Sequence, residues 1–152
     1  MIQRIQTIWL LLAAITVSSL LIFPMVTTTV GSDEYQVLAT GLYQKASGEF
    51  KQLESYLPLM IATIAVALMS LANIFNFKNR TAQKRVIMAN VALIIGLSFW
   101  CSVYAKKIPG GLEVANYNVG MFAPAIAIFF CILALRGINH DEKLIRSADR
   151  LR

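Results

Sequence analysis

The sequence contains few charged side chains and many apolar ones. Asp, Glu, Lys and Arg together make up 14% of the chain, hydrophobic residues make up 57%, and the mean hydropathy is +0.63. Soluble domains carry roughly 25% charged residues, so this composition excludes an ordinary soluble protein. The formal net charge of +6 does not indicate a nucleic-acid partner, because the basic residues cluster beside apolar runs.

The sequence also lacks the residue patterns on which catalysis usually depends. Its one histidine, His140, has no Cys or His at a spacing suited to a metal ion. There is no glycine-rich phosphate loop, no G-x-S-x-G sequence and no C-x-x-C pair. No Asp, Glu, Lys, Arg or His lies within any long apolar run, which disfavours a proton-coupled transporter. We therefore expect a protein without enzymatic activity, without a cofactor and without a metal site.

The chain has only two cysteines, Cys101 and Cys131. In the predicted helices they differ in depth by roughly eight residues, which corresponds to ~12 Å along the helix axes. A disulfide requires Cα atoms within ~7 Å of each other. We therefore expect two free thiols that pack as small apolar side chains.

Four long apolar runs dominate the chain. They cover residues 5–26, 57–77, 86–105 and 119–135. Helices of about 17 to 22 residues are long enough to cross the ~30 Å hydrocarbon core of a bilayer. The first run is longer than a typical signal-peptide core and is followed by no A-x-A-like cleavage site, so we expect it to be retained. The sequence thus predicts an all-α membrane protein in which residues 1–152 form a single four-transmembrane-helix bundle.

The basic residues predict which side of the membrane each segment faces. The connector 78–85 carries four Lys or Arg residues and is too short to return across the membrane, so the flanking runs form an antiparallel hairpin. With both termini inside, ten of the 14 basic residues lie on the inner side, which includes the tail 136–152. The other four lie in the outer loops 27–56 and 106–118. This asymmetry predicts a bacterial inner-membrane protein with cytoplasmic N- and C-termini.

The outer loops carry β-strand patterns. The β-branched run Val26–Val30 and the alternating run Tyr35–Ala39 flank a Gly-Ser-Asp turn, so they predict a β-hairpin. Gly41–Gln44 can extend this pairing, and residues 112–117 of the second outer loop predict a further strand. We therefore expect a small extracytoplasmic β-sheet.

Two amphipathic helices are also predicted. Phe50, Leu53 and Leu57 recur at i, i+3 and i+7, which favours a short helix running into the second span. Residues 139–152 place apolar side chains on one helical face, and Asp141 can cap the start of that helix. We expect a short C-terminal amphipathic cytoplasmic helix that lies on the inner membrane surface.

Two sets of residues are candidates for binding. Asn73 and Asn90 lie about five residues from the basic connector on either side, so their depths match and they can hydrogen-bond across the hairpin. They could form a polar site for a ligand or an ion, or they could simply join the two helices. The second set comprises the basic residues that can contact lipid headgroups or a partner on the inner surface: Lys84, Arg85, Lys143, Arg146 and Arg150.

The two ends of the chain resemble a known family. The similar residues are the opening Met1–Thr7, the Phe23-Pro24 exit from the first run, and the closing segment Asp141–Arg152. They are similar to those of small four-span inner-membrane proteins of Bacteroidetes-type bacteria, which form a domain of unknown function. The resemblance implies the topology and supplies no activity, ligand or catalytic residue.

The outer loops also resemble, in their arrangement, those of claudin-like four-span proteins. Those proteins form strands in a longer first outer loop and add one strand between the third and fourth spans. Gly41-Leu42-Tyr43 stands where they have a Gly-Leu-Trp sequence, and the chain lacks their paired loop cysteines. This likeness implies an architecture and not an activity.

Two functions are compatible with these patterns. The first is a structural or accessory membrane subunit that contacts other membrane proteins, or further copies of itself, through the outer loops or the basic tail. The alternative is a small oligomeric transporter or channel that moves a neutral or apolar solute past Asn73 and Asn90. In both cases the lipid bilayer is the main partner.

Overall fold

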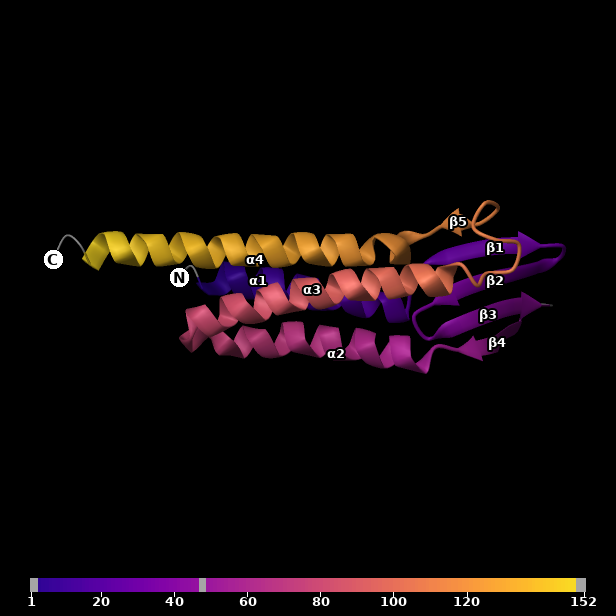
Figure 1. Ribbon diagram of the computed structural model, residues 1–152, viewed down its shortest axis with the longest axis horizontal. Coiled ribbons are helices and arrows are strands. Elements are labelled where there is room, and N and C mark those ends of the chain that lie inside the picture. Colours follow the sequence, from indigo (N-terminus) through magenta and orange to yellow (C-terminus); the bar gives the residue numbers. More distant parts are fainter. Residues whose placement is uncertain (1–2, 47–48, 150–152) are drawn as a thin grey trace.

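The computed structural model describes residues 3–46 and 49–149. Within these residues, the chain forms four long helices that run side by side and a sheet that continues from one end of them (Figure 1). The helices are α1 (Gln3–Ser18), which continues as a 3-10 turn at Ser19–Leu21, α2 (Leu57–Ile74), which continues as a 3-10 turn at Phe75–Lys78, α3 (Arg80–Ala105) and α4 (Val119–Asp149). α1 begins and α4 ends at the end of the bundle opposite the sheet, which we call the distal end.

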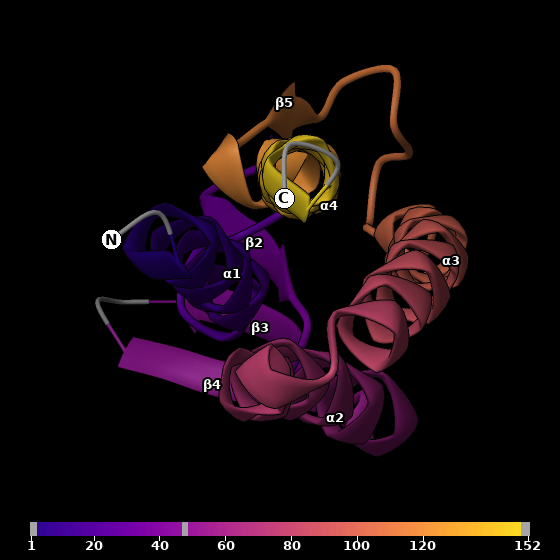
Figure 2. The ribbon, with the colours of Figure 1, turned by 90° about the vertical axis from the view of Figure 1, so that its left-hand side faces the viewer.

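The four helices occupy the corners of a square, with α1 and α3 on one diagonal (Figure 2). α1 packs most extensively against α4 and α2, and α3 completes the bundle by contacting both α2 and α4. Small residues on the facing sides of α1 and α4 allow a close approach, because Ala13, Ala127 and Ala134 are completely buried.

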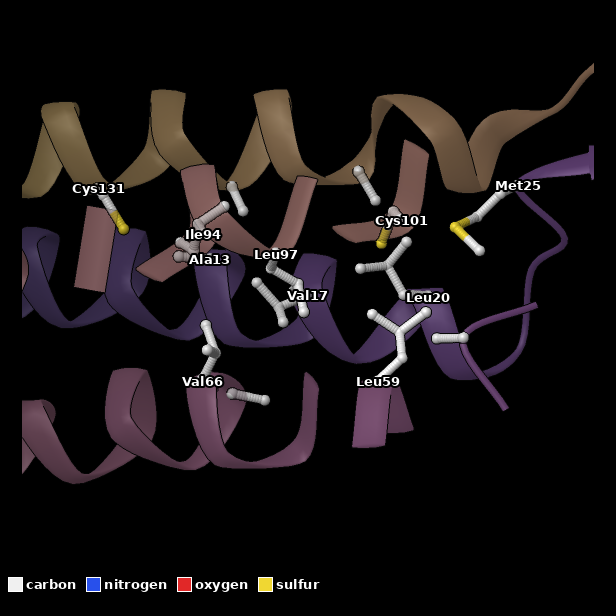
Figure 3. Packing of buried hydrophobic residues seen from close by; sticks show 14 of the residues in the cluster. Ala13, Val17, Leu20, Met25, Leu59, Val66, Ile94, Leu97, Cys101 and Cys131 are labelled. Atoms are coloured by element: carbon white, nitrogen blue, oxygen red, sulfur yellow. The ribbon is translucent and has the colours of Figure 1, made fainter. Parts of the chain in front are cut away.

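Aliphatic side chains fill the space between the helices. Figure 3 shows Val17 of α1, Leu20 of the 3-10 turn that follows it, Leu59 of α2 and Leu97 of α3 directed into a common interior. Each of these side chains is at most 3% exposed. The same cluster continues through Met25 to the root of the sheet, so the bundle and the sheet share one hydrophobic core.

The outward faces of the helices are apolar as well. Between 28% and 33% of the residues are buried in the most apolar stretches of α2, α3 and α4, so most of their hydrophobic side chains face outward. Among the described residues, these three helices are long and apolar enough to span a membrane, while Ile5–Leu21 forms a shorter apolar helix. Helices that are hydrophobic all round are typical of membrane spans or of large protein cores.

The first helix is shorter than the predicted span 5–26. α1 and its 3-10 turn end at Leu21, and Val26 is already the first residue of a strand. The apolar run continues past the helix because Met25 and Val26 are buried at the root of the sheet, where the Met25 N–H donates to the carbonyl oxygen of Val37 at 2.7 Å. Hydropathy alone could not separate the end of the helix from the start of a buried strand.

The loops at the other end form a five-stranded antiparallel sheet among the described residues. Its strands are β1 (Val26–Val30), β2 (Asp33–Leu38), β3 (Gly41–Ala46), β4 (Glu49–Ser55) and β5 (Asn116–Tyr117), in the order β4-β3-β2-β1-β5. The predicted hairpin is confirmed, with Thr28 opposite Tyr35 at its middle. The strand predicted at 112–117 is reduced to two residues, which pair with β1. Four strands thus come from the first loop and one from the second.

The amphipathic helix predicted from Glu49 onward is wrong, because this segment is strand β4. It pairs with β3 in an antiparallel register that places Glu49 opposite Ala46. All of its residues are exposed, including Phe50 and Leu53, so the spacing of these apolar residues does not reflect burial on one helix face. Pairing with β3, a tertiary interaction, overrides the local pattern.

The connector between α2 and α3 is tighter than the predicted loop 78–85. α3 begins at Arg80 rather than near Val86, because Asn79 caps it by accepting a hydrogen bond from the Ala82 N–H at 3.1 Å. Most of the basic segment is therefore helical.

The separate amphipathic helix predicted for the C-terminal tail is also wrong. α4 continues to Asp149 as a single element. α4 stays in the bundle as far as Asp141, because Ile138 is completely buried and Asp141 is only 5% exposed. Its last turns extend beyond the other three helices (Figure 1). Asp141 lies inside the helix and does not cap its start.

One glycine controls how closely the start of α4 approaches the end of α1. The Gly120 N–H donates to the carbonyl oxygen of Pro24 at 3.2 Å. A Cβ at position 120 would lie 2.7 Å from the carbonyl oxygens of both Phe23 and Pro24. We expect Gly120→Ala to displace α4 and to lower the free energy of unfolding by ~1–3 kcal/mol, measured as a lower thermal midpoint in detergent.

Gly96→Ala is the matched control for this prediction. A Cβ at Gly96, which also lies in a helix, meets nothing within 4 Å. Alanine is favoured over glycine in a helix by ~1 kcal/mol, so this variant should be unchanged or more stable. Equal destabilisation of the two variants would contradict a specific close contact at Gly120.

Candidate functional site

An aromatic and charged cluster joins the helices to the sheet. The rings of Tyr56, which precedes α2, and Tyr104, near the end of α3, lie 4.1 Å apart, and Trp100 lies 6.4 Å from Tyr104. The Lys107 ammonium lies 5.0 Å and 5.5 Å from the Tyr104 and Tyr56 ring centroids and 2.8 Å from a carboxylate oxygen of Glu54. The Tyr104 ring therefore contacts both other rings, and Lys107 connects Tyr56 and Tyr104 to β4.

Burial keeps the phenol of Tyr56 neutral. The side chain is 1% exposed. Burial, and then the negative charge of Glu54, raises the pKa of Tyr56 to about 12. This group therefore contributes packing and a dipole at the junction, and it supplies no acid or base near neutral pH.

A polar layer lies toward the distal end of the bundle. The side-chain amide of Asn90 on α3 donates to Ser70 Oγ on α2 at 2.6 Å and lies 3.9 Å from Cys131 Sγ on α4. All three side chains are buried. Ser70 Oγ in turn donates to the carbonyl oxygen of Val66 at 3.2 Å. One asparagine thus connects three helices through side chains that are otherwise surrounded by apolar residues.

The predicted hydrogen bond between Asn73 and Asn90 is absent among the described residues. The Asn73 amide instead donates to the carbonyl oxygen of Gln83 at 3.2 Å, and the Gln83 amide donates to the carbonyl oxygen of Asn73 at 3.3 Å. The predicted pairing of residues between α2 and α3 was wrong because the turn between these helices is shorter than predicted. Asn73 therefore faces Gln83, and Asn90 faces Ser70.

A further buried contact joins the two ends of the chain. Gln6 Nε2 on α1 donates to Asp141 Oδ2 on α4, and the two residues are 7% and 5% exposed. Gly137, one helical turn before Asp141, leaves room for this contact, because a Cβ there would lie 3.2 Å from Gln6 Cγ. The contact explains why the distal part of α4 remains against α1.

Three acceptor atoms of these distal contacts lack a hydrogen-bond partner among the described residues: Asn73 Oδ1, Asn90 Oδ1 and Asp141 Oδ1. Leaving such an acceptor unpaired costs about 1–3 kcal/mol, and buried water usually satisfies it. In the described part of the chain, no group of three or more His, Cys, Asp or Glu side chains could hold a metal ion. The side chains of this polar layer are therefore arranged as hydrogen bonds that connect neighbouring helices.

The distal surface of α3 and α4 carries a charged hollow. The Lys84 ammonium lies 2.6 Å from a Glu142 carboxylate oxygen, and the two side chains are 25% and 29% exposed. Together with Asn139 and Lys143 they line an open hollow of about 350 Å³. Two of the basic residues predicted to face the inner surface, Lys84 and Lys143, therefore share one concave site.

The other predicted basic residues lie elsewhere. Arg85 is exposed on α3. Arg146 lies on α4 with its side chain outside the described part of the structure, and Arg150 lies outside the described residues. The hollow thus depends on Lys84 and Lys143.

The comparison with known families identifies the chain. The family model for a domain of unknown function, DUF4293, matches residues 2–151. The chain belongs to this family. No curated protein matches it. The resemblance noted at the two ends of the sequence is therefore confirmed as far as the family is concerned, and the family assigns no activity to the DUF4293 fold.

In this DUF4293 chain, sequence reasoning missed several residues that form these interhelical contacts or line the charged hollow. They are Gln6, Ser70, Gln83, Asn139 and Glu142. The sequence predicts a loop at Gln83 and a surface helix at Asn139 and Glu142. The one available signal was the position of Gln6 at the start of the first apolar run, because a polar residue there needs a partner.

Proposed function

We propose that the chain is an integral protein of the bacterial inner membrane, crosses it four times and serves as a structural or accessory subunit. The observation that carries this proposal is the apolar outer surface of the helix bundle. Large exposed side chains occur on every helix, for example Ile15, Leu68, Phe99 and Phe129. Soluble monomers rarely expose apolar patches larger than a few hundred Å². A bilayer would cover this surface and leave the polar sheet and the charged distal end in water.

α1 is the shortest of the four proposed spans. Ile5–Leu21 rises about 25 Å as a helix, which is close to the lower limit for crossing the hydrocarbon core. Its outward side chains Ile5, Ile8, Leu11 and Ile15 are exposed apolar residues like those of the other helices. Because α1 packs between α2 and α4, we infer that it shares their membrane position.

The charges at the two ends support an orientation with the distal end in the cytoplasm. Lys84, Arg85 and Lys143 lie on the distal parts of α3 and α4. The sheet carries acidic residues, among them Glu34 and Glu54. Cytoplasmic flanks of spans are enriched in Lys and Arg, so both termini would be cytoplasmic and the sheet would lie outside.

The interior supports a structural role better than a transport role. Asn73 and Asn90, the residues proposed to line a solute path, donate their side-chain amides to neighbouring helices. The sheet, in contrast, offers a surface for a partner. β4 forms one of its two edges, and Phe50 and Leu53 of this strand are 57% and 47% exposed. Edge strands with exposed apolar side chains are sites at which other chains add.

Co-purification from mild detergent tests this proposal. We expect the full chain to recover a membrane-protein partner, or further copies of itself, in fixed stoichiometry. Phe50→Ser combined with Leu53→Ser should reduce this recovery at least about tenfold, because both changes remove apolar contact area from β4. The readout is quantitative mass spectrometry of the purified complex.

Val30→Ser combined with Val114→Ser is the matched control. Both valines are exposed, at 45% and 66%, and lie away from β4. This variant should retain the partner. A wild-type chain that purifies alone as a monomer under every mild condition would refute the role as a subunit.

A further inference from the structure

A second, apolar hollow lies on the same side of the bundle as the charged one. It has a volume of about 180 Å³ and is lined by Ile87, Met88, Val91, Cys131, Ile132 and Leu135. These residues come from α3 and α4, the two helices that also form the charged hollow. Both hollows therefore lie between α3 and α4 and differ in chemistry, and together we call them the α3–α4 groove.

The two parts lie in line along the helices. On α3, Lys84 precedes Met88 by one helical turn, and on α4, Asn139 follows Leu135 by one turn. α3 runs away from the distal end, whereas α4 runs toward it. The step from Met88 back to Lys84 and the step from Leu135 on to Asn139 therefore both lead toward the distal end, from the apolar part to the charged part. The segment from Lys84 to Val91 measures about 10 Å along the axis.

The charged part suits a phosphate group. Among the described residues, the ionisable side chains that line it are Lys84, Lys143 and Glu142, two of them positive and one negative. A lysine ammonium has three donors, and the bond from Lys84 to Glu142 occupies one of them. The side-chain amide of Asn139 supplies a further neutral donor. Basic pockets between helices on the cytoplasmic side are a recognised arrangement for anionic lipid headgroups.

We propose that this α3–α4 groove binds one anionic phospholipid from the inner leaflet. The phosphate lies in the hollow between Lys84 and Lys143, and one acyl chain lies along Met88, Val91 and Leu135. A free phosphate would use only the charged part, whereas a phospholipid fits both parts at once. The inference rests on the membrane placement proposed above and adds a specific ligand to it.

Lipid retention by the full-length chain tests the site. The protein is purified in detergent, mixed with phosphatidylglycerol or phosphatidylcholine, and the bound lipid is titrated by native mass spectrometry. We expect one tightly retained phosphatidylglycerol and at least about tenfold weaker retention of phosphatidylcholine. Lys84→Gln with Lys143→Gln should weaken phosphatidylglycerol binding about thirtyfold, since each lysine near an anionic headgroup contributes a factor of about five.

Two further variants separate binding from folding. Glu142→Gln breaks the same ion pair as Lys84→Gln but removes a negative charge, so it should keep or strengthen binding of phosphatidylglycerol. Val91→Trp leaves every charge in place and fills the apolar part, so it should weaken binding of the lipid. Lys51→Gln with Lys106→Gln, at exposed positions away from the groove, is the control for a general loss of charge and should bind normally.

Clear results would overturn the inference. They are equal retention of the two lipids, equal weakening in the Lys51→Gln, Lys106→Gln control, weaker binding in Glu142→Gln, or full displacement of the lipid by glycerol phosphate. The last result would indicate a site for a soluble phosphate compound. A chain that recovers its protein partner but shows no lipid preference would refute the lipid site alone and leave the role as a subunit standing.

Discussion

A membrane-impermeant maleimide is expected to label Ser32→Cys fully in intact cells and to leave Asn76→Cys unlabelled. Ser32 lies in the exposed turn between β1 and β2, and Asn76 is exposed in the 3-10 turn between α2 and α3 at the distal end. In the proposed topology these positions lie on opposite sides of the membrane. The difference should be all or none, because the reagent does not cross the bilayer.

The native cysteines do not interfere with this measurement. Cys101 and Cys131 are free but only 2% and 0% exposed, so the wild-type chain serves as the unlabelled control. Asn76→Cys should become reactive once the membrane is made permeable. Labelling of both variants in intact cells, or of Asn76→Cys alone, would exclude the proposed orientation.

Gln6→Met should lower the free energy of unfolding by about 3 kcal/mol, the largest stability effect that we expect from a single substitution in the bundle. Gln6 is the donor to Asp141, and both residues are more than nine-tenths buried. Methionine has nearly the same length but offers no donor, so the carboxyl group of Asp141 would remain buried without this partner. Thermal unfolding in a fixed detergent, followed by circular dichroism, measures the loss.

The double variant Gln6→Met with Asp141→Leu is the decisive comparison. Replacing both partners of a buried hydrogen bond by apolar side chains can be nearly neutral, so this variant should recover most of the lost stability. Glu113→Gln removes an exposed carboxylate from the segment between α3 and α4 and should have no effect. If the double variant is as unstable as the sum of its two single variants, the contact does not couple α1 to α4.

Local patterns were sufficient for much of this fold. The β-branched residues of Val26–Val30 and the turn at Gly31 predicted the first hairpin correctly, because strand preference and turn geometry depend on neighbouring residues. Gly31 has a φ of 68°, a conformation that glycine adopts without strain. The long apolar runs likewise located α2, α3 and α4.

Sequence patterns predicted the wrong structure where the end of a helix or strand depends on a contact between segments that are far apart in the sequence. Phe50 and Leu53 have helical spacing, yet pairing with β3 makes their segment a strand. The basic segment after Lys78 was expected to be a loop, but the Asn79 cap begins α3 there. That earlier start also changed the partner of Asn73 from Asn90 to Gln83.

The amino-acid sequence by itself determined the apolar helices, the strand-forming segment between the first two helices and the asymmetry of basic residues, because hydropathy, β-branching and charge are properties of short segments. Only the tertiary structure decided which polar side chains meet. The contacts of Gln6 with Asp141, of Asn90 with Ser70 and of Lys84 with Glu142 each join residues on different helices. Their formation depends on where each helix begins and on how the helices are rotated against one another, and packing of the whole bundle sets both.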